Sequence, residues 1–322
     1  MDAPKVSIIF TSFNHKEYLS QALDALLGQS FEDFELIVVD DCSTDGSQLV
    51  LQDYAIRDKR IRLYLNDHNS GSYVYSTNQG AAYARAPYVV FAQCDDYAES
   101  TQLEKMAAVL DAYPSVGVVF SASRMVNELG QCLGEDFEVR EKAFQQACQT
   151  DTFIEKQQMR RYLLHSCVIP NLSAAMVRRE LFEMEGRLSS KYVVLADWDF
   201  WLKTALKTDF YFIRQPLNNF RQHKTTIRAS IKIQRQIEEV FQMYYTFFDI
   251  AQMKAKDTWH WKNRIARIWI FYISQGLRAW FGALPTLLKV SMRYNLYFPF
   301  ILTGQLCVLT LRLIGQKIGI VK

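Results

Sequence analysis

The chain has 322 residues, of which 49% are hydrophobic and 22% charged, with a formal net charge of +3. This is an ordinary globular balance, long enough for one large domain and an accessory piece. The six cysteines form no CxxC pair, which excludes a cysteine zinc motif and a disulfide framework and indicates a reducing cytoplasm. No signal peptide is expected before the first strand.

Four short apolar runs in the first hundred residues predict buried strands, at residues 6–10, 36–39, 61–65 and 89–92. Helical patterns separate them, and Asn14 with Glu17 predicts a capping box for the first helix. Strands that alternate with helices predict an α/β fold with a doubly wound, mainly parallel sheet.

Two of these strands end in paired carboxylates, Asp40-Asp41 and Asp95-Asp96. Ligands of open α/β sheets bind beyond the carboxyl ends of the strands, so we expect one shared crevice there. One acid can accept hydrogen bonds from a base or ribose, and another can hold a divalent cation on the phosphates. The alternative for Asp95-Asp96 is a solvated turn or a cap for the helix near Thr101. No GxGxxG or GxxxxGK[ST] motif occurs, which argues against a dinucleotide fold and a P-loop.

The middle of the chain predicts a strand at residues 116–125, a hairpin turn at 127–130 and a helix from Ile154. A further strand is expected at residues 171–177, and a helix starts near Leu195. Asp197 lies at the N-terminus of that helix, where the helix dipole alone would favour a carboxylate. Trp198 and Trp201 are expected to be packing residues.

Several segments, in order and spacing, resemble family 2 glycosyltransferases of the GT-A fold, over about the first two-thirds of the chain. They are residues 6–14, 36–47 (LIVVDDCSTDGS), Asn69-x-Gly71, 78–96, 197–202 (DWDFWL), and Arg221-Gln222-His223. The resemblance implies a nucleotide-sugar half at about residues 1–100 and an acceptor half at about 101–230, which together form a catalytic domain over 1–230.

The resemblance also implies roles for individual residues. The nucleotide-sugar would be bound by Thr11, Phe13, Asn14, Asp41, Gln93, Cys94 and Asp95. Among these, Phe13 would stack on uracil and Asp41 would bind the base. Asp95 would hold a divalent metal, Mn²⁺ or Mg²⁺, with His223 near the metal or diphosphate and Asp96 as a further ligand. Asp197 would be the general base.

One position departs from the family. The DxD motif maps to Gln93-Cys94-Asp95, so its first acid is replaced by a neutral amide.

Taken together, the resemblance implies an inverting transferase that moves a sugar to a glycan or lipid-linked acceptor in cell-surface polysaccharide synthesis. The alternatives are a degenerate nucleotide-sugar-binding subunit without catalysis and a nucleotidyltransferase.

The last part of the chain, residues 231–322, is expected to form a basic, aromatic-rich helical tail. From Lys254 onward it holds eleven basic residues and one acid, with four of the six tryptophans. Aromatic and basic residues on one helix suit an anionic membrane surface, so we expect a peripheral protein at the inner face of the cell membrane. Residues 296–311 are uncharged but too short for a membrane span. A packed helical cap is the alternative, and nucleic acid is not an expected partner.

Overall fold

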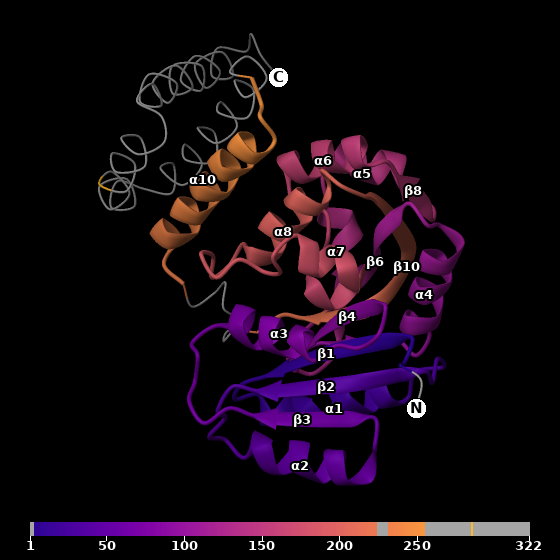
Figure 1. Cartoon of the computed structure of the whole chain (residues 1–322), viewed down its shortest axis with the longest axis vertical. Helices are drawn as coiled ribbons and strands as arrows, with labels where there is room; N and C mark the ends of the chain where they lie inside the picture. Colours follow the sequence, from indigo (N-terminus) through magenta and orange to yellow (C-terminus); the bar gives the residue numbers. More distant parts are fainter. Residues whose placement is uncertain (1–2, 224–230, 255–284, 286–322) are drawn as a thin grey trace. The chain divides into compact units, whose positions relative to one another are not determined.

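The computed structural model describes residues 3–223 and 231–254, together with residue 285 (Figure 1). The chain divides into two compact units, Met1–Ala229 and Ser230–Lys322. The tryptophan-rich and uncharged segments of the tail lie outside the described residues, so the expectations about them are not tested. Among the helices that are described, none is long and apolar enough to cross a bilayer.

The first half of unit 1 is a parallel sheet with helical crossovers. Its strands are β1 (Val6–Ser12), β2 (Phe34–Asp40), β3 (Ile61–Leu65) and β4 (Tyr88–Gln93), in the spatial order β3-β2-β1-β4. The helices between them are α1 (Lys16–Leu27), α2 (Ser47–Arg57) and α3 (Tyr73–Ala82). This half confirms the predicted α/β arrangement.

The second half of unit 1 extends the same sheet with mixed pairing. Strand β9 (Ala175–Arg178) lies antiparallel between β4 and β6 (Val116–Val126), and β10 (Asp209–Arg221) runs parallel to β6. Three short strands pair antiparallel with these: β5 (Tyr97–Ala98), β7 (Cys132–Glu135) and β8 (Thr152–Ile154). The doubly wound parallel pattern therefore stops at β4.

The helices of this half are α4 (Gln102–Ala112), α5 (Lys142–Ala147), α6 (Lys156–His165), α7 (Arg179–Met184) and α8 (Ala196–Thr204). Two predicted boundaries are wrong. Ile154 does not start a helix, because it pairs with Phe210 as the last residue of β8. The strand expected from Asn171 begins only at Ala175, because a 3-10 turn (Leu172–Ala174) precedes it.

The two faces of the parallel sheet are covered differently, as Figure 1 shows. The face with Ile8 and Phe10 packs on side chains of α1, α2 and α4 in one apolar cluster. On the other face α3 approaches β1 so closely that a Cβ on Gly80 would lie 2.6 Å from Ile9 Cγ2. Because α3 follows a parallel strand, its N-terminus lies at the carboxyl edge of the sheet.

The described part of unit 2 consists mainly of the helix α10 (Ile233–Ile250) with a few residues on either side of it. The helix buries four aromatic side chains, Phe241, Tyr244, Phe247 and Phe248. Arg235 forms an i,i+4 ion pair with the buried Glu239 at 3.0 Å. This helix therefore has an apolar face.

Candidate functional site

A cavity of about 380 Å³ lies at the carboxyl ends of β1, β2 and β4. It is lined by Thr11, Ser12, Phe13, His15, Asp41, Asn69, Gly71, Ser72, Tyr73, Ser76, Gln93, Cys94 and Asp95. Asp41 follows β2, and Asp95 follows β4. Both strands are direct neighbours of β1 in the sheet, so the two acids line the same cavity. The two acid-bearing strand ends therefore share the crevice that the sequence predicts.

One side of the cavity carries an aromatic ring and a carboxylate. Phe13 is 41% exposed, which argues against the core role that an isolated phenylalanine would suggest. Thr11 is buried and lies between Val39 and Gln93 on the neighbouring strands. An exposed ring beside a buried polar floor suits a flat heterocycle that stacks on the ring.

Asp41 is buried and held by a loop that follows β3. Its two oxygens accept hydrogen bonds from Ser70 N at 3.0 and 3.1 Å and from Ser70 Oγ at 2.7 Å. Asn66 Nδ2 donates to Asp41 Oδ1 at 3.1 Å, and Asn66 and Gln79 exchange two amide hydrogen bonds of 2.9 and 3.1 Å. Three donor groups, Ser70 N, Ser70 Oγ and Asn66 Nδ2, therefore fix the orientation of the Asp41 carboxylate at the cavity.

Asn14 does not cap the first helix, which corrects the sequence prediction. Its φ of 50° is left-handed, whereas a capping residue is extended. Asn14 N donates to Ser43 Oγ at 2.9 Å, and Asn14 Oδ1 accepts from Thr44 N at 2.8 Å. The first helical turn is capped instead by Asp45 Oδ2, which accepts from Lys16 N at 2.9 Å. Asn14 joins the loops after β1 and β2 and does not line the cavity.

Gln93 and Cys94, the two residues before Asp95, both line the cavity. Gln93 is the last residue of β4 and is half-buried. Cys94 is 5% exposed, and its N–H donates to Thr11 O at 3.2 Å. Burial, and then the neighbouring Asp95 charge, raises the pKa of the Cys94 thiol well above its usual value, which favours the neutral thiol over the thiolate.

At the opposite side of the cavity Asp95 lies next to two histidines. His223 Nε2 is 2.9 Å from Asp95 Oδ2, and the His223 side chain is only 2% exposed. The rings of His15 and His223 meet edge to face, with centroids 5.1 Å apart. One potential ligand atom from each of these residues lies within 4.8 Å of the other two. This set of one carboxylate and two imidazoles fits a divalent cation.

Asp96 lies in the interior, and its placement argues against the expected metal role. The residue is 4% exposed, its Oδ2 accepts from Asn171 Nδ2, and its Oδ1 accepts from Arg221 N at 3.0 Å. Burial, and then the Asp95 charge, raises the pKa of Asp96 well above its usual value. Asp96 is therefore enclosed by the protein and does not line the cavity.

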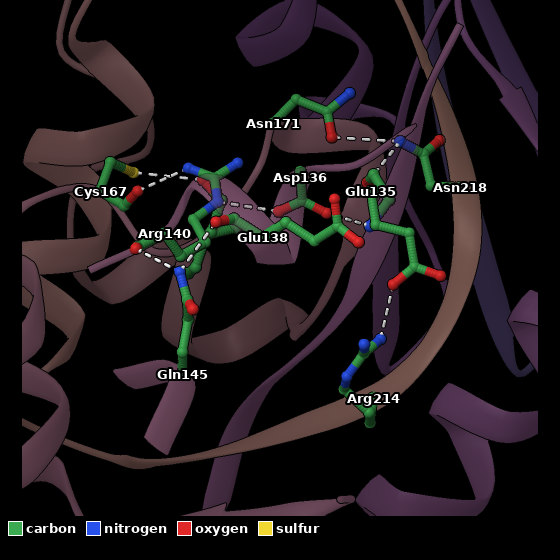
Figure 2. Close-up of polar contacts among 11 residues, drawn as sticks. Glu135, Asp136, Glu138, Arg140, Gln145, Cys167, Asn171, Arg214 and Asn218 are labelled. Carbon is green, nitrogen blue, oxygen red and sulfur yellow. Dashed lines mark hydrogen bonds and ion pairs between the residues drawn. The ribbon is translucent and has the colours of Figure 1, made fainter. Parts of the chain in front are cut away.

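A buried polar network continues behind Asp96, and Figure 2 shows part of it. Asn218 Nδ2 donates to Asn171 Oδ1 and to Ser123 Oγ, both at 3.1 Å. Ser123 N donates to Asp136, whose other oxygen accepts from Arg140 Nε at 2.8 Å. This network ties the loop of Asp95 and Asp96 to β6, to β10 and to Asn171 before the 3-10 turn.

Arg221 anchors the loop that carries Asp95. Although only 2% exposed, it donates from Nε to Asp95 O at 2.8 Å and from its other nitrogens to Asn127 O, Glu128 O and Gln21 Oε1. Its guanidinium also lies 4.4 Å from the centre of the Tyr18 ring. The carboxyl end of β10 thus holds Asp95 through Arg221 and places His223 beside it.

Asp197 lies in the first turn of α8, as predicted, but does not line the cavity. It is half-buried, and its Oδ1 accepts from Trp198 N at 2.7 Å. The packing roles expected for the tryptophans agree with the structure: Trp198 Nε1 donates to Leu163 O at 2.8 Å, and Trp201 is fully buried. The catalytic role of Asp197 stays a prediction.

Sequence reasoning missed His15 and the N-terminus of α3 as parts of the site. His15 shows no partner pattern in the sequence, and its place just after β1 is the one signal that could have found it. Ser72, Tyr73 and Ser76 line the cavity from the start of α3, whose N-terminus lies at the carboxyl edge of the sheet. A helix N-terminus in this position favours an anion.

The model of the glycosyl transferase family 2 domain matches residues 7–184 of the chain. The chain belongs to this family. It is a glycosyltransferase, and its α/β sheet agrees with that role. TuaG of Bacillus subtilis, named for teichuronic acid biosynthesis, is 39% identical over 102 residues, which are 32% of this chain and 40% of TuaG. The chain thus matches less than half of that relative.

Two solved structures share the fold. The TarS 1–349 structure from S. aureus with UDP-GlcNAc has a TM-score of 0.63 at 19% identity, covering 82% of this chain and 71% of that one. The mannosyltransferase PcManGT from Pyrobaculum calidifontis, with GDP-Man and Mn²⁺, has a TM-score of 0.50 at 15% identity. It covers 95% of this chain, and the match covers 87% of PcManGT.

Proposed function

We propose that this glycosyltransferase moves a sugar, with inversion, from a nucleotide-diphosphate sugar to a hydroxyl of a glycan or lipid-linked acceptor. The donor is inferred to be a UDP-sugar and the pathway cell-surface polysaccharide synthesis. The observation that carries the proposal is the single cavity that joins Phe13 and Asp41 to Asp95. Its volume of about 380 Å³ falls within the range of small-molecule sites.

The donor is inferred to lie along the cavity. Phe13 would stack on the base, and Asp41 would accept a hydrogen bond from a base N–H. Uracil and guanine both offer such an N–H, so the flat surface around Phe13 would also contribute to the choice of base. The diphosphate would then lie between the N-terminus of α3 and Asp95, where N–H groups and a metal can both neutralise it.

Asp95 and His223 are the residues that would hold a divalent ion, Mn²⁺ or Mg²⁺. The ion would supply charge neutralisation of the leaving diphosphate. Because Gln93 adds no charge, Asp95 is the single carboxylate that this strand end offers to the cavity. TarS with UDP-GlcNAc and PcManGT with GDP-Man and Mn²⁺ support this choice of donor class and ion.

Asp197 would act as the general base. Its carboxylate would take the proton of the acceptor hydroxyl while the acceptor oxygen bonds to the anomeric carbon. The bond from that carbon to the phosphate oxygen breaks at the same time, and the nucleoside diphosphate leaves with the electron pair. A single displacement of this kind inverts the anomeric configuration.

Purified full-length protein and a panel of UDP- and GDP-sugars test the proposal. We expect nucleoside diphosphate release from one UDP-sugar, dependent on Mn²⁺ or Mg²⁺, and an inverted anomer in early NMR spectra of the released sugar. Asp95→Ala should abolish release, while Asp53→Ala, on the outer side of α2, should not. Donor binding without release from any sugar would favour the degenerate binding subunit. Membership of the family argues against the nucleotidyltransferase alternative.

We also propose that the tail carries the enzyme to the cytoplasmic face of the membrane, where a lipid-linked acceptor is concentrated. The support is the excess of basic and aromatic residues from Lys254 onward. Full-length protein should sediment with anionic liposomes at low salt and be released by high salt. Protein that remains in the supernatant at low salt would favour the packed-cap alternative.

A further inference from the structure

His15, Asp95 and His223 reach one point from three separate loops. They follow β1, β4 and β10, and one potential ligand atom of each lies within 4.8 Å of the other two. The metal role of Asp95 and His223 is already part of the proposed function. His15 adds a second imidazole at the wall of the donor cavity.

The three side chains are held for this arrangement before any ligand arrives. The ring of Tyr18 packs against both imidazoles, with centroids 5.8 Å from His15 and 5.7 Å from His223. Arg221 in turn packs over Tyr18 and binds the backbone of Asp95. Fixed ring orientations favour metal binding, because little conformational entropy is lost when the ion arrives.

The spacing of the three side chains allows them to share one ion, and their chemistry indicates which kind of ion it is. Ligand atoms about 2.1 Å from a metal and at right angles lie roughly 3 Å apart. The separation of His223 Nε2 and Asp95 Oδ2 is 2.9 Å, so both atoms can bind one ion. Two imidazoles and a single carboxylate suit first-row transition ions, whereas Mg²⁺ prefers sites made of oxygen. Mn²⁺ also binds oxygen ligands well, but it accepts imidazole more readily than Mg²⁺ does.

We propose that His15 is a third protein ligand of the metal, which makes this a two-histidine, one-carboxylate site that selects Mn²⁺ over Mg²⁺. The inference rests on the proposed function in one respect: that function explains why a metal ion would be bound at this site. The second imidazole replaces the ligand that Gln93, as a neutral amide, supplies poorly. His15 thereby decides which ion the enzyme takes.

The test measures metal binding by the full-length protein without donor. Electron paramagnetic resonance of free Mn²⁺ gives the affinity, and competition with Mg²⁺ gives the preference. We expect wild type to prefer Mn²⁺, and His15→Ala to lose at least about tenfold in Mn²⁺ affinity, the loss that even outer-shell partners of a ligand cause. His68→Ala, which removes an exposed histidine of unit 1, is the matched control and should bind as wild type.

A spectroscopic measurement separates ligation from an indirect effect. Electron spin-echo modulation of bound Mn²⁺ should show two coupled imidazole nitrogens in wild type and one in His15→Ala. His15→Asn, which offers no imidazole but keeps a polar side chain of similar size, should give the same result if the alanine variant folds poorly. Two nitrogens in either variant, or equal affinity for Mn²⁺ and Mg²⁺ in wild type, would overturn the proposal.

The metal site and the proposed function can fail separately. Two-nitrogen Mn²⁺ binding without diphosphate release from any donor would leave the metal site standing and remove the proposed transfer. Normal release by His15→Ala with unchanged Mn²⁺ affinity would leave the transfer standing and remove His15 as a ligand.

Discussion

Arg221 offers a quantitative test of how the fold supports Asp95. Arg221→Met keeps a long apolar stem and removes the guanidinium, together with its hydrogen bonds to Asp95 O, Asn127 O, Glu128 O and Gln21 Oε1. We expect unit 1 to lose stability and Asp95 to lose the anchor on its carbonyl. Mn²⁺ affinity should therefore fall along with stability.

The magnitude follows from which acceptors water can reach. Gln21 and Glu128 belong to exposed residues, so their oxygens recover hydrogen bonds from solvent. The hydrogen bonds that Arg221 donates to Asp95 O and Asn127 O are not replaced by solvent, and each such bond to a charged group contributes about 1.5–3 kcal/mol of stability. Burying methionine in place of a charge offsets roughly 1–2 kcal/mol of this. The middle of these ranges gives a net loss of about 3 kcal/mol, and we expect about 2–4 kcal/mol, which is within the range of buried network mutations.

Hydrogen exchange followed by mass spectrometry is the assay, because it reports on unit 1 alone in a chain of two units. A loss of 2–4 kcal/mol corresponds to about 30–1000-fold faster exchange of the most protected amides in β1 and β4. Arg214→Met is the matched control on the same strand. Its ion pair with Glu135 (Figure 2) is about one-third exposed on both sides, so we expect at most about 1 kcal/mol.

Two results would contradict this reasoning. Protection of β4 in Arg221→Met equal to that in Arg214→Met would show that the buried guanidinium adds no stability. A full loss of protection with unchanged Mn²⁺ affinity would show that Asp95 does not depend on this anchor.

The remaining predictions concern single steps of the proposed reaction. Asp197→Asn keeps the shape but cannot take a proton, so turnover should fall on the order of 100-fold or more while UDP affinity is unchanged; unchanged turnover would remove Asp197 from the base role. Asn66→Leu removes one donor to Asp41, and calorimetry should show UDP binding weakened about fivefold, as for one hydrogen bond of about 1 kcal/mol, with Mn²⁺ affinity unaltered. Gln93→Asp adds a carboxylate beside Asp95 and should tighten Mn²⁺ binding in the paramagnetic resonance titration; weaker binding would place Gln93 away from the metal.

The sequence by itself determined the parallel half of the fold and the edge at which the site forms. Buried strands of a parallel sheet are continuous apolar runs, and their ends are marked by polar residues such as Asp41 and Asp95. Because all carboxyl ends of such strands lie on one edge, local patterns alone predict a shared crevice. The change to mixed pairing at β9 was not predictable in this way, since strand direction depends on partners far along the chain.

Only the tertiary structure separated residues with the same local pattern. Asp95 and Asp96 are neighbours in sequence, yet one lines the cavity and the other is enclosed by Asn171 and Arg221, which lie more than seventy residues away. Asn14 reads as a helix cap, but contacts with Ser43 and Thr44 on the next loop give it a left-handed backbone. His15 and His223 meet because the loops after β1 and β10 converge, and no periodicity in the sequence records that convergence. Burial and long-range hydrogen bonds decide these roles, and both arise only when the chain has folded.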